Sequence, residues 1–200
     1  MRYCKKNDFQ YSALTMETIN ERVKFFKNAL FDQKIGAVAR SSKFVVESVL
    51  KHVRKPLNLV IEHGAGDGAM TRALLTQLAP NGKLYAIESN HEFAKDLHMI
   101  NDDRLNVYIG NAQEFHAENP LQIYGADLIV SSIPFSFLRS QEREELIKYA
   151  YDSLLPEGIF IIFHQYSWLM FAPLKKIFPM VNISFEPRNL FPCFILEARK

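Results

Sequence analysis

A short segment rich in glycine and acidic residues is the first candidate for a binding site. Residues 60–69 read VIEHGAGDGA, so three glycines follow an apolar run and precede an amphipathic stretch. The pattern predicts a buried strand, a turn containing Gly64, Gly66 and Gly68, and a helix beginning at Ala69. Glycine permits positive φ and close backbone approach, and a helix N-terminus presents unpaired N–H groups. The segment predicts a ligand-binding turn; the simpler alternative is a tight strand-to-helix connection.

Two acidic residues near this turn indicate the charge of the ligand. Glu62 ends the first predicted strand, where a carboxylate suits a cation and would sit poorly beside a pyrophosphate. Glu88 ends the second predicted strand, where an acid can accept hydrogen bonds from both hydroxyls of a ribose. The spacing Gly64-x-Gly66-x-x-Ala69 also matches the dinucleotide fingerprint. S-adenosylmethionine carries an ammonium, a sulfonium and a ribose, so the charges favour it over NAD.

A polar residue after the third predicted strand could complete a nucleoside site. Gly110-Asn111-Ala112 follows the apolar run 105–109. The side-chain oxygen of Asn111 can accept a hydrogen bond from an adenine amino group. An asparagine that only forms a turn is the alternative.

Together these residues resemble the motifs of the class I S-adenosylmethionine-dependent methyltransferases. The resemblance rests on Glu-x-Gly-x-Gly-x-Gly after the first strand, the acid after the second, and the polar residue before Ala112. Many members of that class have Asp where this chain has Asn111. The resemblance implies S-adenosylmethionine as the cofactor and assigns its binding to ten residues: Glu62, Gly64, Ala65, Gly66, Gly68, Glu88, Ser89, Asn111, Ala112 and Ser131.

The end of the fourth predicted strand is the candidate acceptor site. Residues 130–135 read VSSIPF, and in such sheets ligands bind beyond the carboxyl ends of the strands. The segment is similar to the Asn-x-Pro-Tyr motif of enzymes that methylate amino groups, with Ser131 in place of Asn. A serine can accept a hydrogen bond, but it lacks the carboxamide suited to adenine, so a nucleic-acid acceptor is disfavoured without being excluded. The catalytic candidates are Ser131, Pro134, Phe135 and Tyr166.

Three stretches resemble the bacterial phospholipid N-methyltransferases over roughly residues 20–200. They are KIGAVARSS at 34–42, VSSIP at 130–134 and PRNLFP at 187–192. That family usually has Gly-Leu-Pro after the serine and Pro-Pro in the last loop, where this chain has Ser-Ile-Pro and Phe-Pro. The resemblance implies methyl transfer to the amino group of phosphatidylethanolamine or of a methylated derivative.

Other functions fit parts of the same pattern. An rRNA adenine N6-dimethyltransferase would share the fold but would normally carry Asn-x-Pro-Tyr and a C-terminal helical domain. A methyltransferase for a small amine, or a cofactor-binding protein without activity, would show the same turn. An NAD-dependent oxidoreductase is disfavoured by Glu62 and by the two strand-like runs at the end of the chain.

These residues require an α/β framework to bring them together. Apolar runs at 57–62, 84–87, 105–109, 127–131 and 159–163 predict strands, with helices over 69–78, 91–100 and 141–154. This alternation predicts a Rossmann-like, mostly parallel sheet covered by helices on both faces. Runs at 181–186 and 193–198 have no helix between them, so we expect a hairpin and an antiparallel last strand, which makes seven strands.

The first quarter of the chain differs from the rest in charge. Residues 1–55 hold 12 Lys and Arg against 5 Asp and Glu, although the net charge of the chain is only +2. Apolar spacing predicts helices over 15–34 and 42–53, which we expect to form an N-terminal cap on the same domain as the core at 56–200. The 15–34 helix is expected to contact an anionic membrane surface; a solvated lysine-rich face is the alternative.

Cysteine usage and hydropathy indicate where the protein works. Cys4 and Cys193 show neither metal-site nor redox spacing, which fits reduced thiols in the cytoplasm and no bound metal. The first residues lack the apolar region of a secretory signal, and no apolar run approaches the length of a membrane span. We therefore expect a cytoplasmic protein whose membrane contact is peripheral, on the inner face.

Overall fold

The structure is a computed structural model, and it describes residues 42–53, 56–118, 123–189 and 192–200. The chain divides into two compact units, residues 1–40 and 41–200. All the elements below belong to the second unit. The expected helix over 15–34 and nearly all of the stretch 34–42 lie outside the described residues, so they stay predictions.

Helices and strands alternate along the second unit, as the apolar runs predict. In chain order they are α3 (Lys43–Leu50), β1 (Leu57–His63), α4 (Ala69–Leu75), β2 (Leu78–Glu88), α5 (His91–His98), β3 (Leu105–Ile109), α6 (Ala112–Glu118), β4 (Ala126–Ser131), η2 (Phe135–Phe137), α7 (Ser140–Ser153), β5 (Leu154–His164), η3 (Ser167–Met170), α8 (Phe171–Lys175), β6 (Met180–Glu186) and β7 (Cys193–Arg199). Among the described residues, no helix has both the length and the apolar character that crossing a membrane requires.

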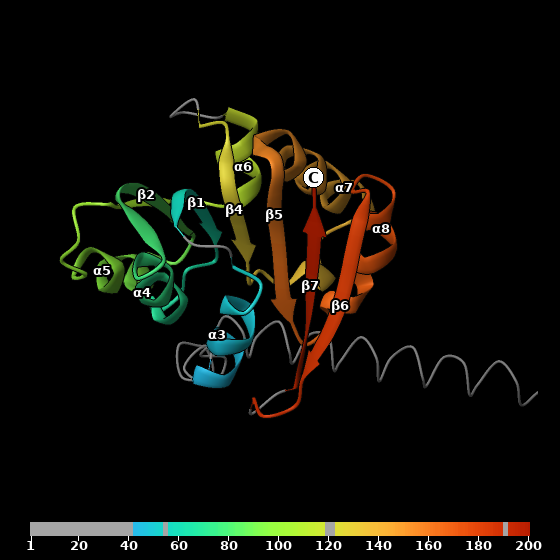
Figure 1. The fold of residues 1–200 in the computed structure, drawn as a ribbon, viewed down its shortest axis with the longest axis horizontal. Helices are drawn as coiled ribbons and strands as arrows, with labels where there is room; N and C mark the ends of the chain where they lie inside the picture. Colours follow the sequence, from blue (N-terminus) through green and yellow to red (C-terminus); the bar gives the residue numbers. More distant parts are fainter. Residues whose placement is uncertain (1–41, 54–55, 119–122, 190–191) are drawn as a thin grey trace, which may run out of the picture. The chain divides into compact units, whose positions relative to one another are not determined.

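The strands form one seven-stranded sheet in the order β3-β2-β1-β4-β5-β7-β6. Strands β1 to β5 pair in parallel, whereas β7 lies between β5 and β6 and runs antiparallel to both, as Figure 1 shows. The expected Rossmann-like sheet with an antiparallel last strand is therefore confirmed. The strand order reverses between β1 and β4, which is where open α/β sheets bind ligands.

Successive residues of the central strands face opposite sides of the sheet, and each side has its own apolar core. On one side Ile61 and Ile129 pack with Phe115 of α6 and Leu146 of α7. On the other side Val60 and Leu128 pack with α3 and α4. Burial on both faces explains why these strands are almost continuously apolar in sequence.

Two local differences from the predicted elements have simple causes. Helix α4 ends at Leu75, short of residue 78, because Leu78 begins β2 and pairs with Leu57 of β1. Helix α6 was not predicted, because its seven residues are too few for a clear helical period. Its buried residues Phe115 and His116 nevertheless anchor it to the sheet.

Polar contacts tie α3 to the terminal hairpin. Ser48 Oγ donates a hydrogen bond to Glu186 Oε2 at 2.6 Å, and Arg188 donates to both carboxylate oxygens of Glu186 at 2.8 Å. The Arg188 guanidinium also lies 4.7 Å from the centre of the Phe44 ring. These bonds hold the pKa of Glu186 well below its usual range, with the Arg188 side chain the largest cause. Arg188, in the described part of the stretch 187–192, therefore links helix α3 to the sheet.

Candidate active site

The carboxyl ends of β1 and β4 bring the glycine turn and the 131–135 segment side by side. His63 and Ser131 are the last paired residues of these two strands. Beyond them, Ser132 N–H donates to the His63 carbonyl at 3.0 Å, and Ser132 Oγ donates to the Gly64 carbonyl at 2.6 Å. The residues expected to bind the cofactor and the acceptor therefore meet at the point where the strand order reverses.

The turn between β1 and α4 has the backbone conformation that its glycines allow. Gly64, Gly66 and Gly68 have φ values of 73°, 55° and 79°, and Gly68 is the N-cap of α4. A Cβ on Gly68 would lie 2.9 Å from Arg72 Nη1, whereas a Cβ on Gly66 would have no atom within 4 Å. The turn is therefore packed on its Gly68 side and open at Gly66, where a ligand can approach the backbone.

Glu88 holds this turn against the end of β2. Its Oε2 accepts a hydrogen bond from Gly66 N–H at 2.8 Å, and its Oε1 accepts one from Asn90 N–H at 2.8 Å. The carboxyl group is nearly buried, whereas the neighbouring Ser89 is exposed. A carboxylate oxygen can accept more than one hydrogen bond, so both oxygens retain capacity for ribose hydroxyls.

Asn111 lies after β3 and caps α6. Its Oδ1 accepts a hydrogen bond from Glu114 N–H at 2.8 Å, and the next residue, Ala112, is buried. Asn111 therefore has a structural role, capping the start of α6, in addition to any contact with adenine. The oxygen has a second lone pair, so an adenine amino group can also bind there.

Glu62 is a buried acid on the other side of the turn. It is 2% exposed, and Thr71 Oγ1 donates a hydrogen bond to its Oε2 at 2.7 Å. Burial raises the pKa of Glu62 to about 8; the Thr71 hydrogen bond opposes this shift, and the negative charges of Glu88 and Asp67 add to it. A cation beside Glu62 would favour the ionised carboxylate, so the site suits a positively charged ligand.

The raised pKa of Glu62 predicts a pH dependence of stability. Between pH 4.5 and 8 the folded protein keeps a proton that the unfolded chain has lost, so stability is full below pH 4.5 and falls as pH rises toward 8. The slope is at most about 1.4 kcal/mol per pH unit. Urea unfolding from pH 5 to 8 should show this loss relative to Glu62→Gln, which has no proton there to lose. Parallel pH profiles for the two proteins would contradict the assignment.

The expected acceptor residues are placed differently from one another. Ser131 and Phe135 are fully buried, and Ser131 Oγ has no hydrogen-bond partner among the described residues. Pro134 is half-buried, directly before η2. Tyr166 lies beyond the end of β5 and is 47% exposed. The structure therefore gathers Ser131, Pro134 and Phe135 beside the turn, with Tyr166 following the neighbouring strand.

Sequence reasoning did not identify two features beside the turn. One is Ser132, whose hydrogen bonds to the His63 and Gly64 carbonyls are described above, and the other is a buried pair of histidines. His63 Nε2 and His116 Nε2 lie 2.8 Å apart, so one ring donates to the other. Burial lowers the pKa of His63 well below its usual range and that of His116 to about 4, which keeps both rings neutral. No local pattern signals this pair, because the two residues lie far apart in sequence. Among the described residues, no three or more His, Cys, Asp or Glu side chains are arranged to hold a metal ion.

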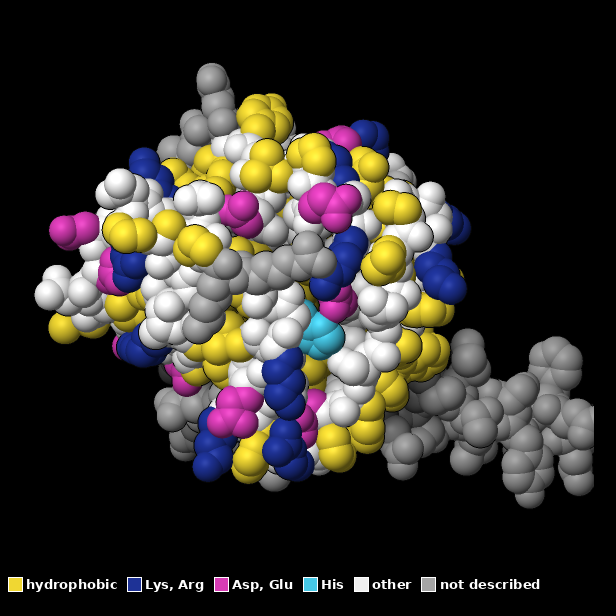
Figure 2. Space-filling model, in the orientation of Figure 1, with side chains coloured by type: hydrophobic (Ala, Val, Ile, Leu, Met, Phe, Trp, Pro, Cys, Tyr) yellow, Lys and Arg dark blue, Asp and Glu magenta, His cyan; other side chains and the backbone are white. Residues whose placement is uncertain are grey.

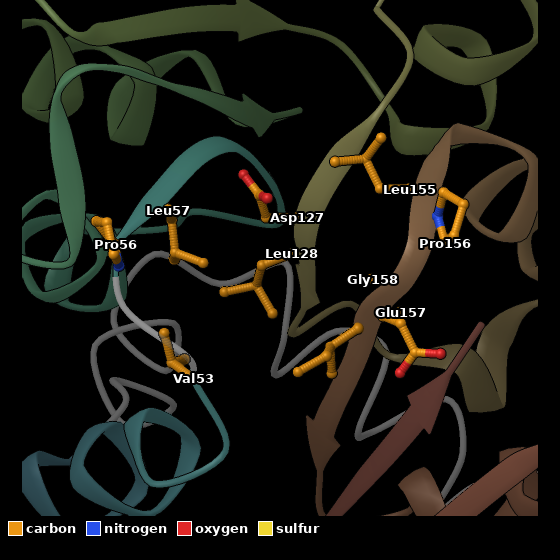
Figure 3. Close-up of a pocket in the computed structure, with 10 residues that line it drawn as sticks. Val53, Pro56, Leu57, Asp127, Leu128, Leu155, Pro156, Glu157 and Gly158 are labelled. Atoms are coloured by element: carbon orange, nitrogen blue, oxygen red, sulfur yellow. The ribbon is translucent and has the colours of Figure 1, made fainter.

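A cavity of about 230 Å³ lies at the other end of the central strands from the glycine turn, and Figure 3 shows residues that line it. Leu57, Asp127 and Leu155, near the starts of β1, β4 and β5, help to line it. It therefore lies at the amino ends of these strands, away from the glycine turn, and has no part in the candidate active site.

The sequence is similar to that of a lipid-modifying enzyme. It is 26% identical over 173 residues to an ornithine lipid N-methyltransferase from Singulisphaera acidiphila, a match that covers 84% of this chain and 88% of the relative. No family model matches the sequence.

Solved structures share the fold at low sequence identity. The N-methyltransferase NodS from Bradyrhizobium japonicum WM9 matches with a TM-score of 0.63 and 13% identity, over 78% of this chain and 92% of that protein. Spermidine synthase from Thermotoga maritima matches with a TM-score of 0.60 and 20% identity, over 79% of this chain; the chain spans only 60% of the synthase. This protein therefore has the Rossmann-like fold of class I S-adenosylmethionine-dependent methyltransferases, and its sequence resembles that of a lipid N-methyltransferase.

Proposed function

We propose that this protein transfers the methyl group of S-adenosylmethionine to the amino group of a membrane lipid, phosphatidylethanolamine or a methylated derivative. Similarity to the ornithine lipid enzyme supports methyl transfer to nitrogen in a lipid-related substrate. The observation that carries the proposal is the glycine turn, which is open at Gly66 and flanked by the acids Glu62 and Glu88. An acceptor carrying the ornithine amino group is the second candidate, since the similar enzyme is an ornithine lipid N-methyltransferase.

The residues around the turn divide the binding of the cofactor among them. When bound, S-adenosylmethionine supplies a methyl group activated by its sulfonium. Glu62 would balance the positive charge, Glu88 would accept the ribose hydroxyls, and Asn111 would accept the adenine amino group. Backbone groups of the turn would complete the site. The resemblance to class I methyltransferases assigns five further residues to its lining: Gly64, Ala65, Gly68, Ser89 and Ala112.

At the acceptor end, the main task of the protein is to position a neutral amine. Holding the reacting groups in line contributes roughly 7–11 kcal/mol in well-oriented cases. Ser131 and Pro134 lie beside the turn, where the sequence places the acceptor. Phe135 is buried, so Tyr166 and Trp168, 47% and 50% exposed, are the aromatic rings available to face an ammonium.

Exposed apolar side chains near the same edge suit a lipid substrate. Ile183 and Phe185 of β6 are exposed, and Figure 2 shows hydrophobic side chains along the side of the molecule on which β6 lies. Ser167, between Tyr166 and Trp168, donates a hydrogen bond to the Phe194 carbonyl at 2.6 Å, and Phe194 pairs with Phe185. We also propose that the enzyme is cytoplasmic and that residues 15–34 contact anionic lipid at the inner face of the membrane.

Transfer of a labelled methyl group tests the choice of acceptor. Vesicles of phosphatidylethanolamine, vesicles containing ornithine lipid, rRNA and soluble amines are offered in parallel, with phosphatidylcholine vesicles as the control that has no amine to methylate. We expect label in the phosphatidylethanolamine. Label in the ornithine lipid alone would replace the acceptor, and label in RNA with none in lipid would contradict the proposal.

A further inference from the structure

The two neighbouring serines at the end of β4 face different surroundings. Ser131 is fully buried and, as the pairing partner of His63, lies on the face of the sheet covered by α6 and α7. Ser132 is half-buried and follows the last residue of the strand. Its backbone N–H donates to the His63 carbonyl at 3.0 Å, which fixes it beside the glycine turn.

The hydrogen bond of the Ser132 side chain determines how its oxygen is oriented. Ser132 Oγ lies 2.6 Å from the Gly64 carbonyl and 3.4 Å from the His63 carbonyl. A carbonyl only accepts, so the hydroxyl hydrogen must point to the turn. The two lone pairs of Oγ then point away from the Gly64 carbonyl, and because Ser132 is only half-buried they can accept a hydrogen bond from a ligand beside the turn.

We propose that Ser132, rather than Ser131, is the catalytic residue that contacts the acceptor, by accepting a hydrogen bond from an N–H of the amine. This inference rests on the proposed function, because it needs an amine acceptor and a methyl donor held at the turn. It assigns a role to a residue that sequence reasoning did not include in the site.

The hydrogen bond would strengthen as the reaction proceeds. The nitrogen lone pair forms a bond to the methyl carbon while the carbon–sulfur bond breaks and its electron pair stays on sulfur. Positive charge moves from sulfur to nitrogen, so the N–H becomes a stronger donor to Ser132 Oγ. The extra proton leaves the product ammonium to water, since the hydrogen of Ser132 itself is held by the Gly64 carbonyl.

This contact limits how many methyl transfers Ser132 can assist. A neutral primary amine offers two N–H donors and a monomethylated amine offers one, whereas a dimethylated amine offers none. Ser132 therefore assists the first and second transfers and contributes nothing to the third. The acceptor's degree of methylation becomes an internal probe of this hydroxyl.

The test compares Ser132→Ala with the unmodified protein on phosphatidylethanolamine and its mono- and dimethyl derivatives. We expect kcat to fall about 10- to 100-fold on the first two lipids. The rate on the dimethyl lipid should fall far less, so the ratio of the primary-amine rate to the tertiary-amine rate should drop about 10-fold or more. Loss of the hydrogen bond to the Gly64 carbonyl acts on the turn and lowers all three rates by the same factor. Ser132→Thr keeps a hydroxyl and should restore the ratio between the primary and tertiary amines.

The matched control is Ser184→Ala, which removes a hydroxyl that lies 3.5 Å from the Ile195 carbonyl on the hairpin. It should leave all three rates unchanged. Loss of folded protein would lower the three rates by the same factor and leave their ratios unchanged. Equal losses in Ser132→Ala would therefore show no selectivity for N–H donors and would overturn the inference, as would a selective loss in Ser131→Ala alone. Absence of transfer from the unmodified protein to every amino lipid overturns the proposed function itself, which the other outcomes leave standing.

Discussion

Replacement of Glu88 by alanine is expected to weaken binding of S-adenosylhomocysteine by about 100-fold or more. Hydrogen bonds to a charged group contribute about 1.5–3 kcal/mol each, and the proposed site uses this carboxylate for two ribose hydroxyls. The same change removes the acceptor for Gly66 N–H, so the turn loses its tie to β2. Isothermal calorimetry with the purified protein measures the affinity, and circular dichroism checks the fold.

Two further variants separate the charge of Glu88 from its shape. Glu88→Gln keeps one side-chain oxygen, so its affinity should lie between those of the alanine variant and the unmodified protein. Glu92→Gln is the control, because Glu92 is exposed on α5 and pairs with Lys95. Unchanged affinity in Glu88→Ala would remove the ribose contact from the account.

Replacement of Gly66 by alanine is expected to weaken the same ligand by about 100-fold while leaving the protein folded. The added Cβ would meet no protein atom within 4 Å, so it would project into the open side of the turn. Filling well-packed space costs up to about 3 kcal/mol, here at the expense of the ligand. The positive φ of 55° should cost only about 1–2 kcal/mol of stability. Calorimetry and urea unfolding measure the two effects separately.

Gly64→Ala should mainly lower the stability of the fold, whereas Gly66→Ala should mainly lower the affinity for the ligand. Its Cβ would lie 3.0 Å from Ser132 Oγ and 3.1 Å from Ile133 Cγ2, so the strain falls on the protein. We expect a stability loss of about 2–5 kcal/mol, from positive φ and overpacking together. If Gly66→Ala lost as much stability as Gly64→Ala and kept the ligand, the turn would be a structural connection only.

The sequence predicts the sheet because the strand signal is strong. Strands β1 and β4 are buried on both faces, so they appear as continuous apolar runs bounded by turn residues. The hairpin of β6 and β7 was predictable because no helix-length segment separates the two runs. By contrast, α6 has seven residues, and its attachment depends on contacts of Phe115 and His116 with distant parts of the chain.

The binding half of the site was more predictable than the acceptor half. Positive φ and close approach restrict residue choice, so Gly64, Gly66 and Gly68 are visible in the sequence. The predicted strand 127–131 ends at Ser131, as β4 does, so the end of the strand was visible in the sequence. The contacts that place Ser132 were not, because its hydrogen bonds to the His63 and Gly64 carbonyls join residues far apart in the chain.

Calorimetry of the unmodified protein tests the central claim, that the turn between Glu62 and Gly68 binds S-adenosylmethionine and its demethylated product. S-adenosylmethionine and S-adenosylhomocysteine are titrated in turn, and NAD is titrated under the same conditions. The account predicts saturable heat at one site for the two adenosyl compounds and none for NAD. Heat with NAD alone, or with none of the three, would contradict it.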